Sequence, residues 1–521
     1  MKKRFLQFTL ITPLLILLLT FVSSSFWWLI VPYLLIISMG FYDLYQTKHS
    51  LWRNYPVLGR FRWVLEELRP PIRQYFIESD IDGVPFNRQT RGLVYRRSKK
   101  EMSTIPFGTK VDVYKAGYEW IGHSLKAINA ETLEQNPRVL IGEKSCSQPY
   151  LASVLNISAM SFGALSSNAI LALGQGAKIG NFALNTGEGG LSHYHLESEA
   201  DLIWQIGTGY FGCRTLQGTF CNNTFKEKAL LPNVKMIEIK LSQGAKPGHG
   251  GILPADKNTV EIAQVRGVEV HTQVDSPPRH SAFNSYEELL HFIENLRELS
   301  GGKPVGFKLA IGQKEEFIEL CQTMHELNIQ PDFITVDGGE GGTGAAPVEY
   351  TNSVGMPLRE ALVFVVDTLV GFELKEDIKV IASGRIIDGM DIVKAMAVGA
   401  DLCASARGMM FALGCIQALQ CHKNKCPTGI ATQDKSLAKA LVVEDKKQRI
   451  ANFHEETLKS FVEIYASAGL SHPNELNRTH IFYRVDQTDY KRYDELFVPL
   501  EKGALLKKPY PKAYEHYMKK V

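Results

Sequence analysis

Residues 333–344 read FITVDGGEGGTG, a short apolar run that passes directly into a glycine-rich loop. Its first four residues are β-branched or aromatic and predict a buried strand at 333–336. An aspartate, Asp337, follows the strand, and glycine fills most of the next seven positions. The same order of apolar run and polar, glycine-rich loop recurs along the middle of the chain, so this stretch sets the expectation for the fold.

Short apolar runs alternate with helical stretches from residue 154 onward. In 286–299 and 315–327 apolar residues recur three and four positions apart, the spacing of an amphipathic helix. Eight strand–helix units in about 250 residues predict an α/β fold, a parallel (β/α)8 TIM barrel. A doubly wound open sheet is the alternative, and the long gap at 187–235 is expected to hold an excursion over the barrel mouth. The predicted strands are 154–160, 182–185, 236–241, 268–274, 305–309, 333–336, 379–382 and 401–404.

Glycine-rich or polar clusters follow six of these strands, at the end where a barrel of this kind carries its chemistry. Glycines let the backbone approach a ligand closely, and converging N–H groups bind phosphate. The loops after the last two strands, with Ser383, Gly384 and Arg407, are the predicted phosphate site. Residues 339–344 match G-x-G-x-x-G formally, but no helix follows directly, so we interpret them as a barrel loop. The clusters are 160–163, 186–190, 243–251, 275–278, 337–344 and 383–385.

Several charged residues on this rim are candidates for catalysis and binding. Lys246 lies in a glycine-rich loop, where a positioned cation suits an anionic substrate or a proton transfer. The plain alternative is an exposed loop lysine. Lys240 and Arg266 would add positive charge for carboxylates, and Glu188 is the best candidate for a general base. Lys308, at the end of the fifth strand, could face a flavin, or it could be a buried lysine with a carboxylate partner.

Three cysteines, Cys415, Cys421 and Cys426, lie within twelve residues, and a proline follows the last of them. Thiolates grouped this way are typical of iron–sulfur ligation, and three of them favour a three-iron cluster. Zinc is the competitor, with His422 as a fourth ligand, although adjacent residues chelate a tetrahedral ion poorly. A reactive thiol pair or buried structural cysteines are the remaining alternatives.

The N-terminus carries two uncharged apolar runs, 5–22 and 26–42, each about long enough to span a membrane. Lys and Arg residues precede the first run and follow the second, and none lies between them. This pattern predicts a transmembrane helical hairpin with both ends, and the catalytic domain, on the cytoplasmic side. A cleaved signal peptide or a single anchor is the alternative.

The whole chain has 521 residues, 22% of them charged, and a formal net charge of +3. This composition excludes a disordered chain, and the near-neutral charge gives no field for nucleic acid. Eight cysteines are too few for a disulfide framework. The expected divisions are a membrane hairpin at 1–46, a capping segment at 47–140, the barrel with its cysteine motif at 141–436 and a C-terminal helical segment at 437–521.

Residues 157–433 resemble the FMN-binding synthase domain of glutamate synthase, most of all its short, stand-alone archaeal-type form. The resemblance covers somewhat more than half of the chain and rests on several specific motifs. These are SFG at 161–163, NTGEGG at 185–190, QGAKPG at 243–248, GGTGA at 341–345, and the three cysteines with the CPTGIATQ stretch at 426–433.

The resemblance implies a barrel that holds FMN, with a [3Fe–4S] cluster beside it. Electrons from an external donor, such as ferredoxin or a separate reductase, would pass through the cluster to FMN. A hydride would then reduce 2-iminoglutarate, formed from 2-oxoglutarate and ammonia, to L-glutamate. By the same resemblance Lys246 acts at the iminoglutarate, Lys240 and Arg266 belong to the substrate and flavin site, and Glu188 lies near FMN.

The resemblance also assigns Cys415, Cys421 and Cys426 as the cluster ligands. Together with the barrel loops, it gives the expected cofactor-binding residues. These are Ser161, Gly187, Glu188, Lys240, Lys308, Gly341, Gly342, Thr343, Ser383, Gly384 and Arg407.

The chain departs from the family pattern at the rim. Ile252 stands where the family has a glutamine that helps to hold the 2-oxoglutarate carboxylate, His249 replaces a glutamate, and Ala406-Arg407 replaces a Gly-Thr pair. We find no N-terminal cysteine nucleophile and no nicotinamide domain, so ammonia and electrons are expected from outside the chain. Two alternatives follow: an FMN enzyme for a different amino, imino or oxo acid, or a non-enzymatic, membrane-tethered electron-transfer subunit.

Overall fold

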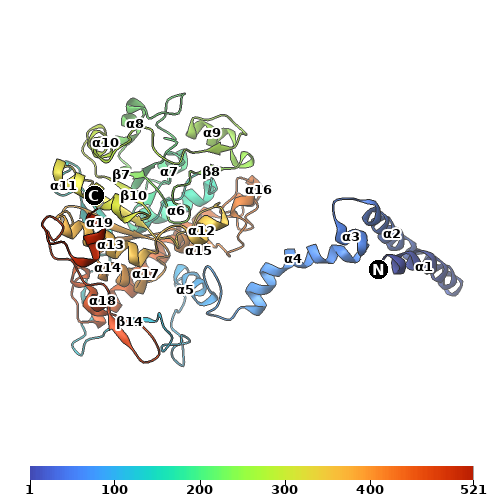
Figure 1. Cartoon of the computed structure of the whole chain (residues 1–521). Helices are drawn as coiled ribbons and strands as arrows, with labels where there is room; N and C mark the ends of the chain where they lie inside the picture. The colour runs from blue at the N-terminus through green and yellow to red at the C-terminus, as the bar shows by residue number, and fades with distance from the viewer. Residues whose placement is uncertain (520–521) are drawn as a thin grey trace. The chain divides into compact units, whose positions relative to one another are not determined.

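The computed structural model describes residues 1–519 and divides into two compact units, Met1–Arg88 and Gln89–Val521 (Figure 1). We describe each unit by itself. The division into four segments expected from the sequence stays a prediction. Within the second unit, however, the described parts of the expected capping and C-terminal segments pack with the barrel as one compact body.

The centre of the second unit is a closed barrel of eight parallel strands, which confirms the predicted (β/α)8 fold. Each strand pairs in parallel with its two neighbours, and β13 closes the ring by pairing with β4. In order around the ring the strands are β4 (Leu155–Ile157), β5 (Leu184–Asn185), β6 (Leu202–Ile206), β7 (Val234–Lys240), β10 (Val305–Leu309), β11 (Phe333–Asp337), β12 (Lys379–Ser383) and β13 (Leu402–Ser405).

One predicted barrel strand is wrong and one real strand was missed. Residues 268–274 alternate as a strand would, but only β9 (Val274–Asp275) is extended there, and it pairs with β8 (Ile252–Leu253) outside the barrel. The third barrel strand is instead β6, inside the stretch expected to be an excursion. All five of its residues are buried, so it shows no alternation of polar and apolar residues.

Helices surround the barrel, and the two predicted amphipathic helices are confirmed as α10 (Tyr286–Leu299) and α11 (Lys314–Leu327). The longest helix of the second unit, α17 (Val443–Ser467), packs closely against α6 (Ser167–Gly180). The other helices of this unit are α5 (Arg88–Ser98), α7 (His193–Glu197), α8 (Asn222–Ala229), α9 (Val260–Arg266), α12 (Val348–Ser353), α13 (Leu358–Gly371), α14 (Gly389–Ala397), α15 (Arg407–Leu413), α16 (Lys435–Ala438), α18 (Tyr493–Leu496) and α19 (Lys512–Met518).

A hairpin closes one end of the barrel. Its strands, β2 (Arg138–Ile141) and β3 (Tyr150–Ser153), contribute Ile141 and Tyr150 to a buried cluster with Met236, Phe333 and Leu402. The last three residues begin or nearly begin their strands, so the hairpin covers the N-terminal end. The C-terminal end is left for the site. A separate small sheet pairs β1 (Glu119–Ile121), β14 (Ile481–Arg484) and β15 (Tyr490–Arg492).

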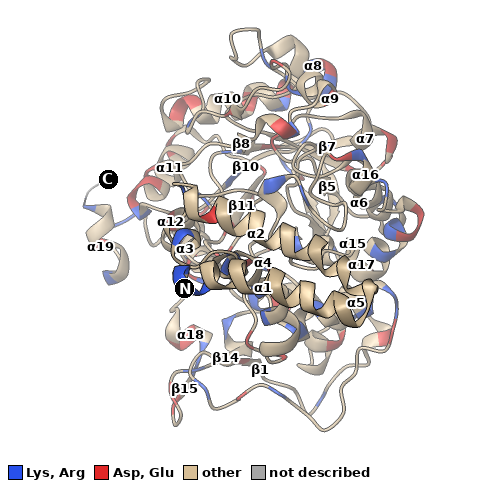
Figure 2. Cartoon of the chain, turned by 90° about the vertical axis from the view of Figure 1, so that its right-hand side faces the viewer, with Lys and Arg blue, Asp and Glu red and all other residues tan. Residues whose placement is uncertain are grey.

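The first unit contains two helical stretches that are long and apolar enough to cross a membrane. The first is α1 (Lys2–Val22), and the second runs through a short 3-10 turn into α2 (Ile30–Tyr45). Figure 2 shows both helices free of charge except near their outer ends. Only 11% of each apolar window is buried, whereas a core helix of a soluble protein would be mostly buried. After α3 (Ser50–Asn54) comes α4 (Phe61–Ile72), which continues into a short π-helix at Arg73–Ile77.

Candidate active site

Glu188 lies at the centre of a cluster of basic side chains at the C-terminal end of the barrel. It follows β5, and its Oε1 lies 2.8 Å from Nζ of Lys240, the last residue of β7. Burial opposes ionisation of Glu188, but the charges of Lys240, Lys246 and Arg266 together hold its pKa below the usual value. The glutamate is therefore an anion held among three cations.

Lys246 and Arg266 are both almost fully buried, with 3% and 5% of their surfaces exposed. Burial lowers the pKa of Lys246, and it lowers that of Arg266 to about 10. The guanidinium of Arg266 lies 4.9 Å from the ring centre of Phe211 and donates from Nη2 to the Phe162 carbonyl. Among the described residues its Nε has no hydrogen-bond partner. The plain alternative for Lys246, an exposed loop lysine, is wrong.

Asp337 connects four strands of the barrel, although the sequence analysis did not single it out. Its carboxylate lies 3.3 Å from Nζ of Lys308, accepts a 2.9 Å hydrogen bond from Ser383 and accepts another from the amide of Gly244. Lys308 is therefore a buried lysine with a carboxylate partner. The signal for Asp337 was present, because it is the polar residue that ends a strand before a glycine-rich loop.

The loops around this cluster approach one another so closely that only glycine fits. A Cβ added to Gly244 would lie 1.7 Å from the carbonyl oxygen of Gly338. A Cβ on Gly187 would lie 2.7 Å from the amide nitrogen of Ser161, and the φ of Gly187 is +64°. These contacts bring the loops after β4 and β5 together, and likewise those after β7 and β11, so the predicted residues of different strands share one rim.

The predicted phosphate loops also meet. Arg407, at the start of α15, donates to the carbonyl of Glu340, and a Cβ on Gly342 would lie 2.9 Å from Cδ of Arg407. Burial lowers the pKa of Arg407 to about 10. Gly384 has a φ of +137° and lies against Gly338. The neighbouring loop of Gly341, Gly342 and Thr343 has Thr343 exposed.

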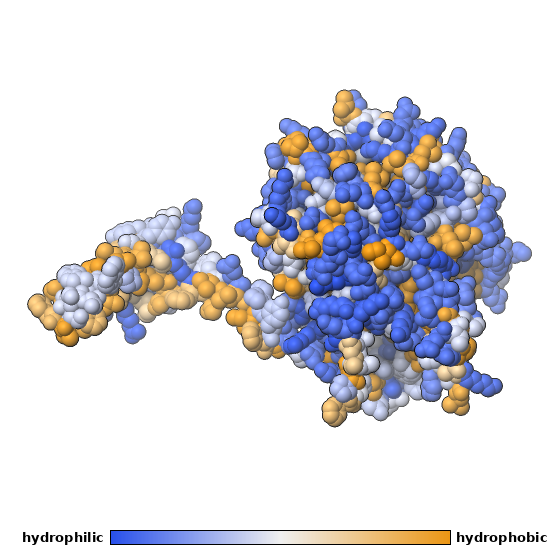
Figure 3. Space-filling model, turned by 180° about the vertical axis from the view of Figure 1, so that it is seen from behind, coloured by the Kyte–Doolittle hydropathy of each residue, from blue (hydrophilic) through white to orange (hydrophobic). Residues whose placement is uncertain are grey.

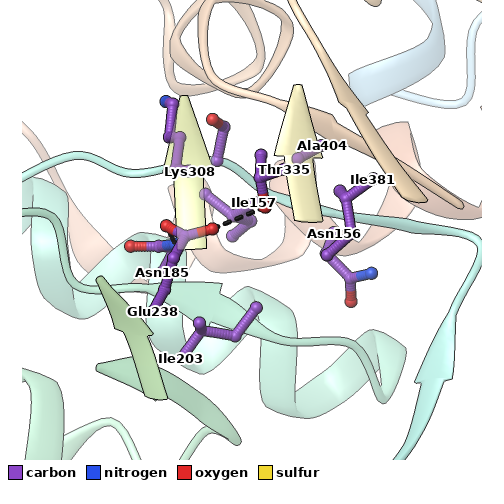
Figure 4. A pocket seen from close by; sticks show the side chains of 10 residues that line it. Asn156, Ile157, Asn185, Ile203, Glu238, Lys308, Thr335, Ile381 and Ala404 are labelled. Carbon is purple, nitrogen blue, oxygen red and sulfur yellow. Dashed lines mark hydrogen bonds between the residues drawn. The ribbon is translucent and has the colours of Figure 1, made fainter. Parts of the chain in front are cut away.

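A small cavity lined by both polar and apolar side chains lies inside the barrel (Figure 4). It has room for little more than about one water molecule. Glu238 of β7 points into it and accepts hydrogen bonds from Asn185, Gln205 and Thr335, each 2.6–2.7 Å long. Lys308 also lines the cavity. Sequence reasoning missed Glu238, because nothing in a seven-residue strand marks which polar side chain points inward.

The three cysteines of the motif lie on one loop after α15, and no disulfide joins them. Burial raises the pKa of Cys415 to about 11, and burial with the neighbouring Cys426 raises that of Cys421. Burial also opposes ionisation of Cys426, but hydrogen bonds from backbone amides, the strongest from Ala431, bring its pKa below the usual value. Each thiol lies within electrostatic range of the others.

Among residues 1–519, no three His, Cys, Asp or Glu side chains gather closely enough to hold a single metal ion. The zinc and iron–sulfur alternatives for the three cysteines therefore both stay predictions from the sequence.

Lys257 binds the cysteine loop through hydrogen bonds from its ammonium group. The sequence analysis did not predict this role. It is 4% exposed, and its Nζ donates to the carbonyls of Cys421 at 2.8 Å, Ala431 at 3.2 Å and Ala164 at 3.4 Å. One ammonium group thus joins the cysteine loop, the segment after it and the loop after β4. The sequence around Lys257 could not predict these hydrogen bonds, because the partners are backbone atoms far away in the chain.

Two of the three departures from the family pattern, Ile252 and His249, lie beside the loops that surround Glu188. Ile252 is 37% exposed and pairs with Asp275 across the β8–β9 hairpin. His249 contacts the carbonyl of Gly250 through Nδ1 and packs edge-on against Tyr350, with the ring centres 5.3 Å apart. The amide of His249 donates to the carbonyl of Lys246 at 3.2 Å, but among the described residues neither side chain forms a hydrogen bond with Glu188 or its cations.

Residues 110–471 match the family model for the conserved region in glutamate synthase. The chain belongs to the glutamate synthase family. This span includes the whole barrel, the rim cluster and the cysteine loop, so family membership makes the protein an oxidoreductase of the glutamate synthase type.

Relatives of the family differ in how much of their length the chain covers. It is 39% identical over 492 residues to the glutamate synthase large subunit-like protein YerD of Bacillus subtilis, covering 87% of this chain and 93% of YerD. It is 35% identical to the archaeal-type glutamate synthase [NADPH] of Thermotoga neapolitana and 34% identical to the archaeal glutamate synthase [NADPH] of Methanocaldococcus jannaschii. In these two cases the match covers 60% and 62% of this chain and 59% and 60% of the relative.

Among solved structures, a mandelate oxidase mutant with an FMN adduct aligns with 82% of this chain and 99% of its own. The identity is 13% and the TM-score is 0.40. At this level the likeness carries no argument about the site.

Proposed function

We propose that the protein is a membrane-anchored oxidoreductase that holds FMN and a [3Fe–4S] cluster and reduces 2-iminoglutarate, from 2-oxoglutarate and ammonia, to L-glutamate. The electrons come from an external donor, ferredoxin or a separate reductase. The observation that carries the proposal is the group of Lys240, Lys246 and Arg266 around the buried Glu188 at the mouth of a barrel of this family.

The residues of the rim fit FMN. Arg407 and the Ser383-Gly384 loop supply a cation and close-packed backbone for the phosphate, and Lys308 supplies a cation beside the barrel interior. The unpartnered Nε of the buried Arg266 is a donor that an anionic ligand would satisfy. When bound, FMN supplies the hydride chemistry. The remaining predicted contacts lie on the loops after β4, β5 and β11. They are Ser161, Gly187, Gly341, Gly342 and Thr343.

The chain's own residues bind the substrate and handle its protons. Lys240 and Arg266 attract the carboxylates of a dicarboxylic acid, since both are basic side chains in a site with little water. Lys246, whose pKa is lowered, gives a proton to the nitrogen of the substrate more readily than an ordinary lysine. Glu188 stays ionised and keeps the ammonium of Lys240 in position.

The cysteine loop fits an iron–sulfur cluster through the chemistry of its donors. Cys415, Cys421 and Cys426 offer three free thiols on one loop, and backbone amides favour the thiolate of Cys426. The loop also lies against the rim, because Gln433 donates to the carbonyls of Gly163 and Leu165 in the loop after β4. A cluster held there would lie beside the FMN site.

The two apolar helices of the first unit support the membrane anchor. Their exposed apolar surface would be unfavourable in water and suits lipid. Basic residues flank the pair on its two outer ends, which supports a cytoplasmic position for both ends and for the catalytic domain.

Cofactor content tests this proposal directly. Protein purified in detergent should show a flavin spectrum, release FMN on denaturation and give an EPR signal of an oxidised three-iron cluster. Colourless protein that takes up neither FMN nor iron on reconstitution would contradict the proposal.

A different amino, imino or oxo acid is the second candidate substrate. Ile252, an apolar residue on the β8–β9 hairpin, cannot donate a hydrogen bond to a carboxylate, and His249 replaces a family carboxylate. Restoring the donor with Ile252→Gln separates the two cases. If 2-oxoglutarate is the substrate, its KM should fall or stay the same; a variant that gains activity the natural protein lacks would favour the other acid.

A further inference from the structure

The first unit contains an amphipathic helix whose apolar face nothing in that unit covers. In α4 and the turn after it, apolar residues recur at 61, 64, 65, 68, 72, 76 and 77, the spacing of one helix face. All of them are exposed, with Leu65 at 61%, Phe76 at 84% and Ile77 at 71%. Figure 3 shows hydrophobic residues over much of the surface of the first unit, on the face drawn.

A buried ion pair and several hydrogen bonds connect the start of this helix to the end of the second apolar span. Asp43, in the last turn of α2, is fully buried and accepts hydrogen bonds from Arg60, the shortest at 2.6 Å, and from the amide of Val57. The guanidinium of Arg60 also lies 4.4 Å from the ring centre of Trp52. We call residues 42–63 the elbow.

Aromatic rings fill the elbow. His49 and Trp52 lie 4.1 Å apart between ring centres, and Trp63 packs edge-on against both at 5.3 Å. Gln46 closes the turn by hydrogen bonds to the carbonyls of Asp43 and His49. Trp and Arg side chains of this kind are typical of the boundary between a bilayer and water.

The contacts of the elbow set the position of α4 relative to the end of the second apolar span. Because Arg60 binds Asp43, the start of α4 is held level with the last turn of the span, at the membrane surface if α2 crosses the membrane. The segment carries Arg62, Arg69 and Arg73 beside its apolar face, and Arg62 pairs with Glu66 at 3.3 Å and Arg73 with Glu78 at 3.1 Å. These partly exposed guanidinium groups lie at the edge of the apolar face, where they can exchange a carboxylate partner for an anionic headgroup of a cytoplasmic leaflet.

We propose that α4 and its extension, residues 61–77, lie in the surface of an anionic lipid bilayer with the apolar face toward the acyl chains. This inference rests on the proposed membrane anchor and extends it. Since the elbow fixes where α4 leaves the span, the segment acts as a second attachment of the first unit to the membrane.

Photocrosslinking in the full chain tests the proposal. Benzoylphenylalanine is placed at Leu65 or Phe76 on the apolar face, at Glu66 on the opposite face, and at Leu14, which is exposed in α1. The protein is reconstituted in phosphatidylcholine vesicles with or without phosphatidylglycerol, irradiated and analysed by mass spectrometry. We expect lipid adducts at Leu65 and Phe76 at least several-fold above Glu66, and more of them when phosphatidylglycerol is present.

The outcomes separate this inference from the anchor itself. Lipid adducts at Leu14 but not at Leu65 and Phe76 overturn the surface helix and leave the anchor standing. No lipid adduct at any position overturns both. Adducts at Leu65 that join two copies of the chain, or lipid adducts indifferent to phosphatidylglycerol, also overturn the proposal, because the apolar face would then bind protein or the arginines would not select the lipid.

Discussion

At the residue scale, the account depends on how one buried carboxylate organises three cations. Glu188 and Lys240 form a 2.8 Å pair, and Lys246 and Arg266 add two further basic groups out of contact with bulk water. In such surroundings a charge interacts more strongly than at the surface, and the cost of leaving it without a partner is also larger. A dicarboxylic substrate would supply the negative charge that the cluster otherwise lacks.

The pH dependence of substrate binding should follow Lys246. Because burial lowers its pKa, the ammonium group loses its proton at a lower pH than an ordinary lysine, and its attraction for a carboxylate is lost as pH rises through that value. We expect KM for 2-oxoglutarate to rise on the alkaline side. In Lys246→Arg the rise should move to higher pH, since guanidinium keeps its proton. An unshifted profile would contradict this role.

Replacing the same lysine with alanine separates an enzyme from an electron carrier. Lys246→Ala should keep bound FMN and still accept electrons, but product formation should fall by about 100-fold or more, the usual size of a proton-transfer contribution. Product formation that stays near the natural rate would favour a non-enzymatic electron-transfer role.

Lys257 should determine whether the cysteine loop keeps its shape. Lys257→Met removes three hydrogen bonds to carbonyls, each contributing about 1.5–3 kcal/mol for a charged donor. We expect less iron and acid-labile sulfide per chain and, in cluster-free protein, faster reaction of the loop thiols with a thiol reagent. Lys423→Met, an exposed lysine of the same loop, is the matched control. Equal iron content and thiol reactivity in both variants would refute the positioning role.

At the element scale, the barrel could be predicted because five of its strands are short apolar runs followed by glycine-rich or polar clusters. The β6 strand could not, since it is buried throughout and its Gln205 points to a partner, Glu238, that only the folded barrel provides. The prediction of a strand at 268–274 failed because its apolar and polar residues alternate as in a strand, whereas most of the segment forms turns before β9. Lys246 was predictable from its glycine-rich loop, whereas the role of Lys257 comes from hydrogen bonds to backbone atoms far away in the chain.

The packing of α17 on α6 gives a test at this scale. A Cβ on Gly176 would lie 2.6 Å from Cβ of Ile450 and 2.7 Å from the carbonyl of Lys447. We expect Gly176→Ala to destabilise the second unit by about 1–3 kcal/mol, as overpacking does. Gly92→Ala, in α5, meets only the end of Arg96 at 3.9 Å and should stabilise by about 0.5–1 kcal/mol. Thermal unfolding measures both, and equal shifts would contradict the packing described.

At the scale of the whole molecule, a near-neutral chain with an average composition contains two units that differ in what they expose and enclose. The first unit exposes apolar helices, and the second encloses a barrel whose polar rim is its chemical end. The sequence indicated both, because apolar length and loop composition are local properties. It could not indicate the elbow, which depends on Asp43 meeting Arg60 across seventeen positions.

Membrane attachment is testable without reference to activity. Membranes of cells that express the full chain should retain it after extraction with alkaline carbonate, because a spanning hairpin leaves only with detergent. Intact mass of the purified protein should include residues 1–46. Release by carbonate, or a mature chain that begins after residue 22, would show a peripheral or processed protein instead.

Formation of glutamate tests the central claim most directly. The detergent-solubilised protein is given a chemical reductant, 2-oxoglutarate and 15N-labelled ammonium, and the product is identified by mass spectrometry, with Lys246→Ala as the control. The account predicts 15N-labelled L-glutamate from the natural protein at a rate that depends on reductant, and at least about 100-fold less from the variant. Protein with an intact, reducible flavin that forms no labelled glutamate would contradict it.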